Sequence, residues 1–439
     1  MTDNTIPKLP PSNLGIALTV TKIVSYIIML RCFDVAVVGG GAAGLVAAIS
    51  AARKGDSTLI CERLSRLGKK LLVTGGGRCN LTNENLAPEC FTATDKSPVE
   101  SVFGRIGNED IQHFFRGLGL EVYSEGGRVF PVTNQASSVL HVLDMEIRRL
   151  GIAVELGFET SIVEPSAFGF RIEAGSARMV EAHSVILAAG GRAYPALGSD
   201  GSGLRLARKL GHHIIPPVPS AVPLLVHDKM CHVLQGQKML TRATAMIDGK
   251  PAGTAEGDVL FTQYGLSGTA VLDVSESLSI ALHRDKAKHV AIVLDLVPFM
   301  TQEALAAEFG RRIKAGWVDG ELGAGILPYK FAALIPEILP KGHPDQTKKA
   351  QALAAALKAR RFTVHGTRGW NEAEFTSGGV DAGEVDPRTL ESRLRKGVFF
   401  AGEILDIQGK RGGFNLAWAW ASGLVAGLSA TDPTSRYSV

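Results

Sequence analysis

The chain has 439 residues, of which 45% are hydrophobic and 21% are charged, and its formal net charge at pH 7 is +4. This composition excludes a disordered or fibrous protein, and the length exceeds the roughly 250–300 residues at which one hydrophobic core stops growing, so two or three domains are expected. Basic and acidic residues are interspersed along the chain, which argues against a nucleic-acid-binding groove.

An apolar segment, Leu14–Leu30, lies near the start of the chain, and its only charged residue is Lys22. It is shorter than the ~20 residues that a membrane-spanning helix needs. A signal peptide, a true translation start at Met29 and an accessory extension are three interpretations. We favour an N-terminal extension over residues 1–32 and expect no stable membrane anchor.

The next 30 residues predict a complete β-α-β unit. A strand ends at Gly39, a helix follows the glycines and stops at Gly55, and a second strand ends at Glu62. In the pattern GxGxxG, the glycines permit the tight turn, the close approach of a pyrophosphate and the close packing of helix on strand. Glu62 can then accept hydrogen bonds from the ribose hydroxyls. The unit predicts a site for NAD or FAD; the alternative is an ordinary tight turn with a surface glutamate.

Two further glycine-rich segments favour FAD. Residues 68–83 contain three consecutive glycines among many hydrogen-bond donors, a loop that can lie against a flat ring. Residues 397–423 combine a strand, an acidic turn and a helix start at Gly412-Gly413, where the helix N-terminus would favour the negative charge of a reduced flavin. No second strand–GxGxxG–helix unit is found, so any NAD(P)H would have to dock transiently at the flavin face. Another oxidant or reductant is an equal alternative.

The predicted elements divide the chain into several parts. Residues 33–215 alternate strands and helices and form the first part of the FAD-binding domain. Residues 216–300 read as strands separated by Gly, Asp and Pro, a β-rich insertion. Residues 301–360 are helical, with Asp345 as an N-cap. Residues 361–375 return to the β-rich domain, and residues 376–432 complete the FAD-binding domain.

The glycine-rich motifs resemble those of the BaiN-like, aminoacetone-oxidase-type FAD-dependent oxidoreductases of bacteria. The resemblance runs from about Phe33 to Ala430 and is carried above all by GKKLLVTGGGRCNLTN and FFAGEILDIQGKRGGFNLAWAWASG. It implies an α/β fold, with a two-part Rossmann-like FAD-binding domain, an inserted β-barrel-like domain and a small helical subdomain. The chain departs from the family pattern in its N-terminal extension and in the two tryptophans of the last motif.

The resemblance also implies which residues approach FAD. Glu62 and Arg63 would lie at the adenosine, and Thr160 would contact adenine through its backbone. Lys69 and residues 74–82 would approach the flavin, and residues 412–416 would close over it. The complete predicted set is Gly39, Gly41, Ala43, Gly44, Glu62, Arg63, Lys69, Thr74, Gly75, Gly76, Arg78, Cys79, Asn80, Leu81, Thr82, Thr160, Ala189, Gly190, Gly191, Gly402, Glu403, Gly412, Gly413, Phe414, Asn415 and Leu416.

Several other residues have a plainer interpretation. Cys79 is more typical of a small residue packed in a glycine loop than of a catalytic thiol. His212-His213 is interpreted as a turn, because adjacent side chains do not face each other on a helix. Trp418 and Trp420 are interpreted as core residues. Tyr194 and Arg192 are either substrate contacts or part of a surface turn.

The five cysteines show neither CxxC nor zinc-ligand spacing. We therefore expect no disulfide framework and no metal, and a reducing, cytoplasmic location. The predicted activity is hydride transfer between the flavin N5 and an unidentified small organic substrate held between the flavin and the inserted domain. An RNA-acting or redox-responsive flavoprotein is the alternative. The sequence identifies no catalytic acid or base.

Overall fold

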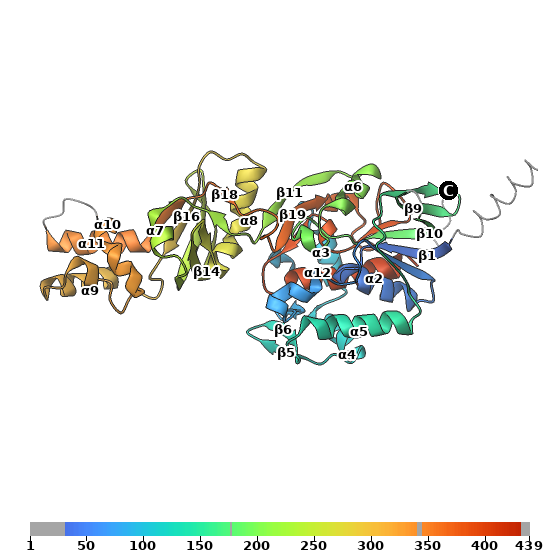
Figure 1. Ribbon diagram of the computed structural model, residues 1–439, viewed down its shortest axis with the longest axis horizontal. Helices are drawn as coiled ribbons and strands as arrows, with labels where there is room; N and C mark the ends of the chain where they lie inside the picture. Colours follow the sequence, from blue (N-terminus) through green and yellow to red (C-terminus); the bar gives the residue numbers. More distant parts are fainter. Residues whose placement is uncertain (1–30, 176–177, 340–344, 432–439) are drawn as a thin grey trace, which may run out of the picture.

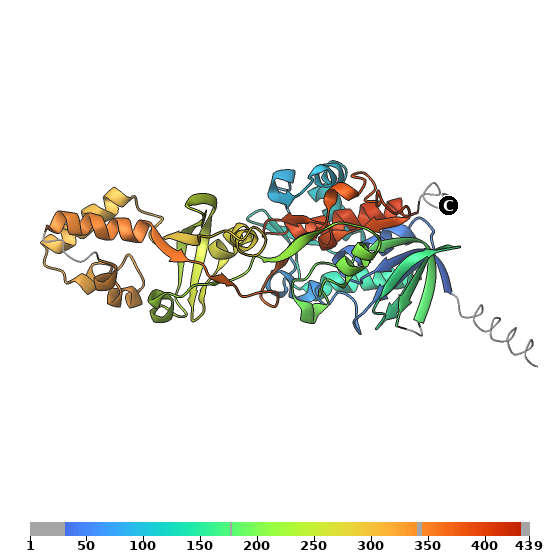
Figure 2. The same ribbon diagram turned by 90° about the horizontal axis from the view of Figure 1, so that it is seen from above.

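The computed structural model describes residues 31–175, 178–339 and 345–431. Figures 1 and 2 show three bodies in a row: an α/β domain, a β-rich domain in the middle and a group of helices at the far end. The predicted extension lies outside the described residues, apart from Arg31 and Cys32. No helix in the described part of the chain is both long and apolar enough to cross a bilayer.

A seven-stranded sheet forms the centre of the α/β domain, in the order β7-β2-β1-β10-β9-β8, with β20 also beside β10. Strands β7, β2, β1, β10 and β20 run parallel, whereas β9 pairs antiparallel with both β10 and β8. The carboxyl ends of the parallel strands therefore meet at one edge, where ligands bind in such folds. The bounds are β1 (Arg31–Val38), β2 (Thr58–Glu62), β7 (Ala153–Leu156), β8 (Ile162–Ser166), β9 (Gly169–Ala174), β10 (Arg178–Leu187) and β20 (Val398–Phe400).

Helices cover this sheet, and two of them approach each other very closely. Helix α12 (Phe414–Ser429) packs on α2 (Ala42–Ala52) through Gly423 and Gly427. A Cβ atom at Gly427 would lie 2.3 Å from the carbonyl oxygen of Ala47, so only glycine allows this contact. The other helices are α3 (Ser97–Phe103), α4 (Asn108–Gly117), α5 (Ala136–Arg149) and α6 (Ser202–Lys209).

Two small sheets and a ribbon complete the α/β domain. One sheet pairs β3 (Thr82–Asn83), β6 (Arg128–Pro131) and β5 (Val122–Glu125), and another pairs β4 (Phe91–Ala93) with β21 (Ile407–Gly409). The ribbon pairs β11 (Ile214–Ser220) with β19 (Phe375–Val380) and leads into and out of the middle domain.

The middle domain is a seven-stranded antiparallel sheet in the order β17-β16-β13-β14-β15-β12-β18. Helix α8 (Thr269–His283) packs against this sheet through buried residues that include Val271, Val274 and Leu278. The sequence predicts strands throughout this region and not α8, because the helix contains several Val, Ile and Thr residues, which are typical of strands. The remaining bounds are β12 (Leu224–Leu225), α7 (Lys229–Val233), β13 (Lys238–Ile247), β14 (Lys250–Thr262), β15 (Gly265–Ser267), β16 (Val290–Asp295), β17 (Arg360–Thr363) and β18 (Gly366–Thr367).

The far group contains α9 (Gln302–Lys314), α10 (Ile335–Ile338) and α11 (Gln346–Lys358). Asp345 caps α11 as predicted, because its carboxylate accepts a hydrogen bond from the Thr347 N–H at 2.8 Å. The architecture confirms the predicted α/β fold class with its insertion. The division at residues 215, 300, 360 and 375 remains our proposal, supported by these strand pairings.

Candidate functional site

A cavity of about 1250 Å³, counting the part open to solvent, lies at the carboxyl ends of β1 and β10. Segments far apart in the chain build its wall: residues 38–43, 61–74, 158–160, 188–206, 374–375 and 401–419 each contribute. The two parts of the α/β domain therefore share one site, and the size suits a large ligand.

The GxGxxG turn forms one side of this cavity. Gly39 and Gly44 are packed tightly, since a Cβ atom at Gly44 would lie 1.9 Å from the Gly39 carbonyl oxygen. A Cβ atom at Gly41, in contrast, would meet no protein atom within 4 Å. Helix α2 begins just after Gly41 without a side-chain cap, so the N–H groups of its first turn remain for a ligand. This arrangement fits the pyrophosphate of a dinucleotide.

Glu62 ends β2 at the cavity wall, and its side chain is buried. One carboxylate oxygen accepts a hydrogen bond from the Gly40 N–H and the other from the Leu64 N–H, both at 2.7 Å. Each oxygen keeps lone pairs for further donors. The backbone thus fixes the carboxylate in place, as a ribose-binding role requires.

Positive charges lie on the same wall. Lys70 pairs with Glu403 at 2.8 Å, and Arg63 pairs with Asp200 at 2.7 Å. Burial opposes ionisation of Asp200, but hydrogen bonds from Ser202 and Arg63 outweigh it and lower its pKa to about 2.

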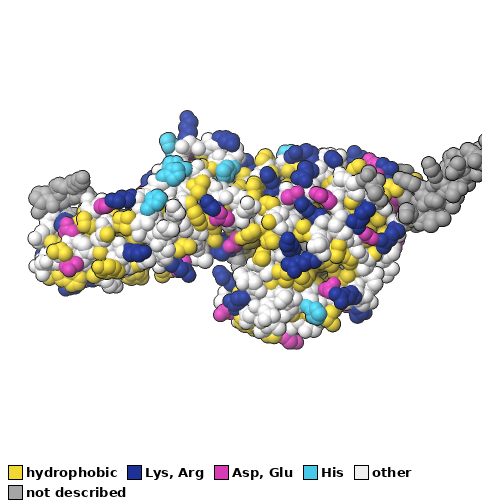
Figure 3. Space-filling view, in the orientation of Figure 1, with side chains coloured by type: hydrophobic (Ala, Val, Ile, Leu, Met, Phe, Trp, Pro, Cys, Tyr) yellow, Lys and Arg dark blue, Asp and Glu magenta, His cyan; other side chains and the backbone are white. Residues whose placement is uncertain are grey.

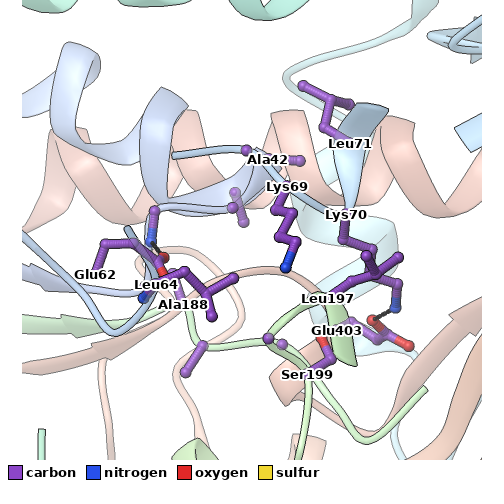
Figure 4. Close-up of a pocket in the computed structure, with 18 of the residues that line it drawn as sticks. Ala42, Glu62, Leu64, Lys69, Lys70, Leu71, Ala188, Leu197, Ser199 and Glu403 are labelled. Atoms are coloured by element: carbon purple, nitrogen blue, oxygen red, sulfur yellow. Dashed lines mark hydrogen bonds and ion pairs between the residues drawn. The ribbon is translucent and has the colours of Figure 1, made fainter. Parts of the chain in front are cut away.

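Lys69, in contrast, donates to the Ala196 carbonyl at 3.2 Å and has no carboxylate partner among the described residues. Figure 4 shows it extending into the cavity. Its charge is therefore available to an anionic ligand.

Thr160 closes another part of the wall. Its hydroxyl is buried and has no hydrogen-bond partner in the described structure. An unsatisfied buried hydroxyl of this kind is costly. A polar ligand group at Thr160 would remove that cost, which fits the predicted adenine end.

Half of the predicted cofactor residues line the cavity, and the other half do not. Those that line it are Gly39, Gly41, Ala43, Glu62, Arg63, Lys69, Thr74, Thr160, Ala189, Gly190, Glu403, Asn415 and Leu416. Those that do not are Gly44, Gly75, Gly76, Arg78, Cys79, Asn80, Leu81, Thr82, Gly191, Gly402, Gly412, Gly413 and Phe414. Their roles toward the cofactor stay a prediction.

Arg78 and Cys79 do not line the cavity but belong to the glycine loop that follows Thr74. The Arg78 guanidinium bonds the Tyr123 hydroxyl at 2.7 Å and the Glu125 carboxylate at 2.8 Å. Cys79 is fully buried with a φ of 60°, and burial raises the pKa of its thiol to about 12. The thiol stays protonated, which supports the interpretation of Cys79 as a packed residue.

Both tryptophans of the last motif are core residues, as interpreted. The Trp418 Nε1–H donates to the Gly402 carbonyl at 3.2 Å, and the Trp420 Nε1–H donates to the Leu81 carbonyl at 3.0 Å. They tie α12 to the two turns that flank the cavity.

His212 and His213 belong to a turn and point apart. The His212 ring is buried, 2.9 Å from the Glu384 carboxylate and 2.8 Å from the Ser392 hydroxyl, whereas His213 is exposed. No group of three or more His, Cys, Asp or Glu side chains in the described structure is arranged to hold a metal.

The sequence analysis missed several residues of the cavity wall. Lys70 had a signal, since it adjoins Lys69 in the same motif. Leu71 lies in that motif too, but an apolar residue there gave no sign of contact with a ligand. The others lie outside the two motifs that carry most of the resemblance: Leu64, Phe158, Leu197, Ser199, Glu374 and Phe375.

Comparisons with known proteins agree with this geometry. The model of the HI0933-like protein Rossmann domain family matches residues 33–429. The chain is 38% identical over 410 residues to the 3-dehydro-bile acid delta(4,6)-reductase of Clostridium scindens, covering 91% of this chain and 99% of that protein. It is 29% identical to the ribosomal RNA dihydrouridine synthase of Haemophilus influenzae, covering 90% and 97%, and 28% identical to that of Escherichia coli, covering 89% and 96%.

Proposed function

The chain belongs to the HI0933-like family of Rossmann-domain proteins and is an FAD-dependent oxidoreductase, and from this premise we propose that it reduces a carbon–carbon double bond conjugated to a carbonyl group. The support is the likeness to a reductase of a 3-dehydro-bile acid over nearly its whole length. The more distant relatives are named for making dihydrouridine, which is uridine with a carbonyl-conjugated ring double bond saturated. Under this proposal, both names describe the reduction of a carbon–carbon double bond that is conjugated to a carbonyl group.

Bound FAD, once reduced, supplies a hydride from N5. The chain's own residues bind and orient the participants. The first turn of α2 and Lys69 would bind the pyrophosphate, and Glu62 would bind the ribose. The start of α12 contributes Asn415 and Leu416 to the cavity wall, where they would contact the ring.

The electron donor in this proposal is NAD(P)H, docking transiently at the flavin face. A second GxGxxG unit is missing from the sequence, so a separate nicotinamide domain of the usual kind is not available.

An RNA base is the second candidate substrate, and the names of two relatives favour it. It requires a surface that attracts phosphates. The face in Figure 3 shows basic side chains interspersed with acidic ones, not a continuous basic stripe. We therefore place a free small molecule first.

Anaerobic flavin spectroscopy tests this proposal. NADH or NADPH should bleach the visible band of the bound flavin, and testosterone, which has a conjugated ketone, should restore it. Mass spectrometry should show that the product gained two hydrogen atoms. Dihydrotestosterone, which lacks the double bond, should leave the flavin reduced. Reoxidation by uridine-containing RNA alone would favour the second candidate, and reoxidation by neither compound would contradict the proposal.

A further inference from the structure

Three segments meet in a cluster of charges at the junction of the α/β and middle domains. Arg411 lies in the loop between β21 and α12, Glu374 directly precedes β19, and Asp273 lies on α8. The Arg411 guanidinium contacts both carboxylates. Because α8 belongs to the middle domain, this guanidinium bridges the two domains.

One member of the cluster reaches the cavity. Glu374 lines the cavity, as does Asn415, four residues after Arg411 in the chain, whereas Arg411 and Asp273 are not among the lining residues. The loop in between turns through Gly412 and Gly413, both with positive φ. A Cβ atom at Gly413 would lie 2.5 Å from the Thr82 carbonyl oxygen, so the loop rests on the glycine loop. From this loop the Arg411 side chain extends to Asp273 of the middle domain.

The two carboxylates hold Arg411 unequally. Glu374 accepts two hydrogen bonds, from Nε at 2.9 Å and from Nη2 at 3.2 Å, and this two-point contact fixes the guanidinium plane. Asp273 accepts a single, longer bond from Nη1 at 3.3 Å. The Asp273 side chain is 37% exposed and that of Arg411 is 21% exposed. The Nη1 edge is thus the weakly held edge of a partly exposed guanidinium.

We propose that Arg411 binds the carbonyl oxygen of the substrate, which replaces Asp273 at Nη1 while Glu374 keeps the guanidinium in place. This inference rests on the proposed function, because hydride addition to a conjugated double bond shifts negative charge onto the carbonyl oxygen. A fixed guanidinium stabilises such charge. Asp273 occupies the edge when no substrate is bound and competes with it.

The state of Asp273 agrees with this role. Burial raises its pKa, although the nearby Arg411 guanidinium acts in the opposite direction. The net shift is upward, so burial outweighs the attraction of Arg411 at this carboxyl group.

Substitution of Asp273 distinguishes an Arg411 that binds the substrate carbonyl from an Arg411 that only bridges the two domains. Asp273→Asn keeps the shape of the side chain and removes the competing charge. If Arg411 binds a carbonyl, the dissociation constant of testosterone for the oxidised holoprotein should fall about 3- to 10-fold, within the range of the net contribution of a typical hydrogen bond. If Arg411 only bridges the domains, this variant should bind testosterone equally or more weakly, and that result would overturn the inference.

Substitution of Arg411 gives the complementary test. Arg411→Lys and Arg411→Gln should raise the dissociation constant about tenfold or more. Binding is measured from the perturbation of the flavin spectrum and by calorimetry, with FAD content and melting temperature recorded for every variant. Unchanged binding in Arg411→Gln would overturn the inference. The matched controls are Asp319→Asn and Arg242→Lys, which change ion pairs remote from the cavity wall and should leave binding unchanged.

The failure of this inference can be distinguished from failure of the proposed function. Dihydrotestosterone keeps the ketone, so its binding should show the same dependence on Arg411. A wild type that binds both steroids through Arg411 but reduces neither contradicts the proposed function alone. A wild type that binds neither steroid nor uridine overturns both.

Discussion

Glu276 lies on α8 three residues after Asp273, and one oxygen of its carboxyl group is buried without a hydrogen-bond partner in the described structure. Burial raises its pKa from 4.5 to about 7, and the nearby Asp406 adds to the shift, against a hydrogen bond from Ser377 and the charge of Arg284. Because the folded pKa exceeds the unfolded one, folding takes up a proton between these values. The stability from this group is present below about pH 4.5 and is lost as the pH rises to about 7.

Glu276→Gln should therefore stabilise the protein in alkaline buffer. The amide cannot ionise, so the variant should exceed the wild type by about 2 kcal/mol in free energy of unfolding at about pH 8, and the difference should shrink toward about pH 5. Urea unfolding at both pH values measures it. Glu121→Gln, on an exposed side chain, should show no such pH-dependent difference. A wild type at least as stable as Glu276→Gln at the higher pH would contradict the argument.

At the scale of elements, the contact between α2 and α12 joins the two parts of the α/β domain. Gly427→Ala should lower the melting temperature and weaken FAD retention, because the added methyl group meets the Ala47 backbone and pushes the helices apart, at a cost of about 1–3 kcal/mol. Gly310→Ala is the matched control. Its Cβ atom would have only an ordinary contact at 4.0 Å, so helix propensity should make it neutral or slightly stabilising. Equal melting temperatures for the two variants would disprove this account.

The elements also show what the sequence can predict. The β-α-β unit was predictable because its strand, turn and helix signals are local and agree with one another. Helix α8 was not, since its apolar spacing is diluted by residues typical of strands.

The site follows the same rule. Glycine motifs contain or adjoin both residues that line the cavity and residues that do not. The sequence therefore predicted cofactor contacts for both Glu62 and Cys79, although in the structure only Glu62 lines the cavity and Cys79 is fully buried. The contact between Arg411 and Asp273 joins residues that are 138 positions apart in the chain, so no local sequence pattern predicts it.

At the scale of the whole molecule, the hydrophobic cores are separate. One large cluster spans the α/β domain, and another joins the middle sheet to the far helices. Calorimetry should therefore resolve two transitions, and removal of FAD should lower only the one that belongs to the α/β domain, because a ligand stabilises the unit that binds it.

A substitution in one hydrophobic core shows which of the two transitions belongs to that core. Phe309 is fully buried in α9, so Phe309→Ala should lower only the transition that is insensitive to FAD, by the equivalent of about 3–5 kcal/mol. A single transition that moves as a whole with FAD would contradict the independence of the cores.

The packing of α12 on α2 also has a consequence for synthesis. The ribosome makes α2 long before α12, and the cavity wall needs Asn415, Leu416 and Ala419 of α12. The continuous segment 224–367 carries the complete middle sheet and can fold while the chain is still growing. A nascent chain therefore completes its cofactor cavity only after α12 has been translated, and products that stop short of α12 are made without the cofactor.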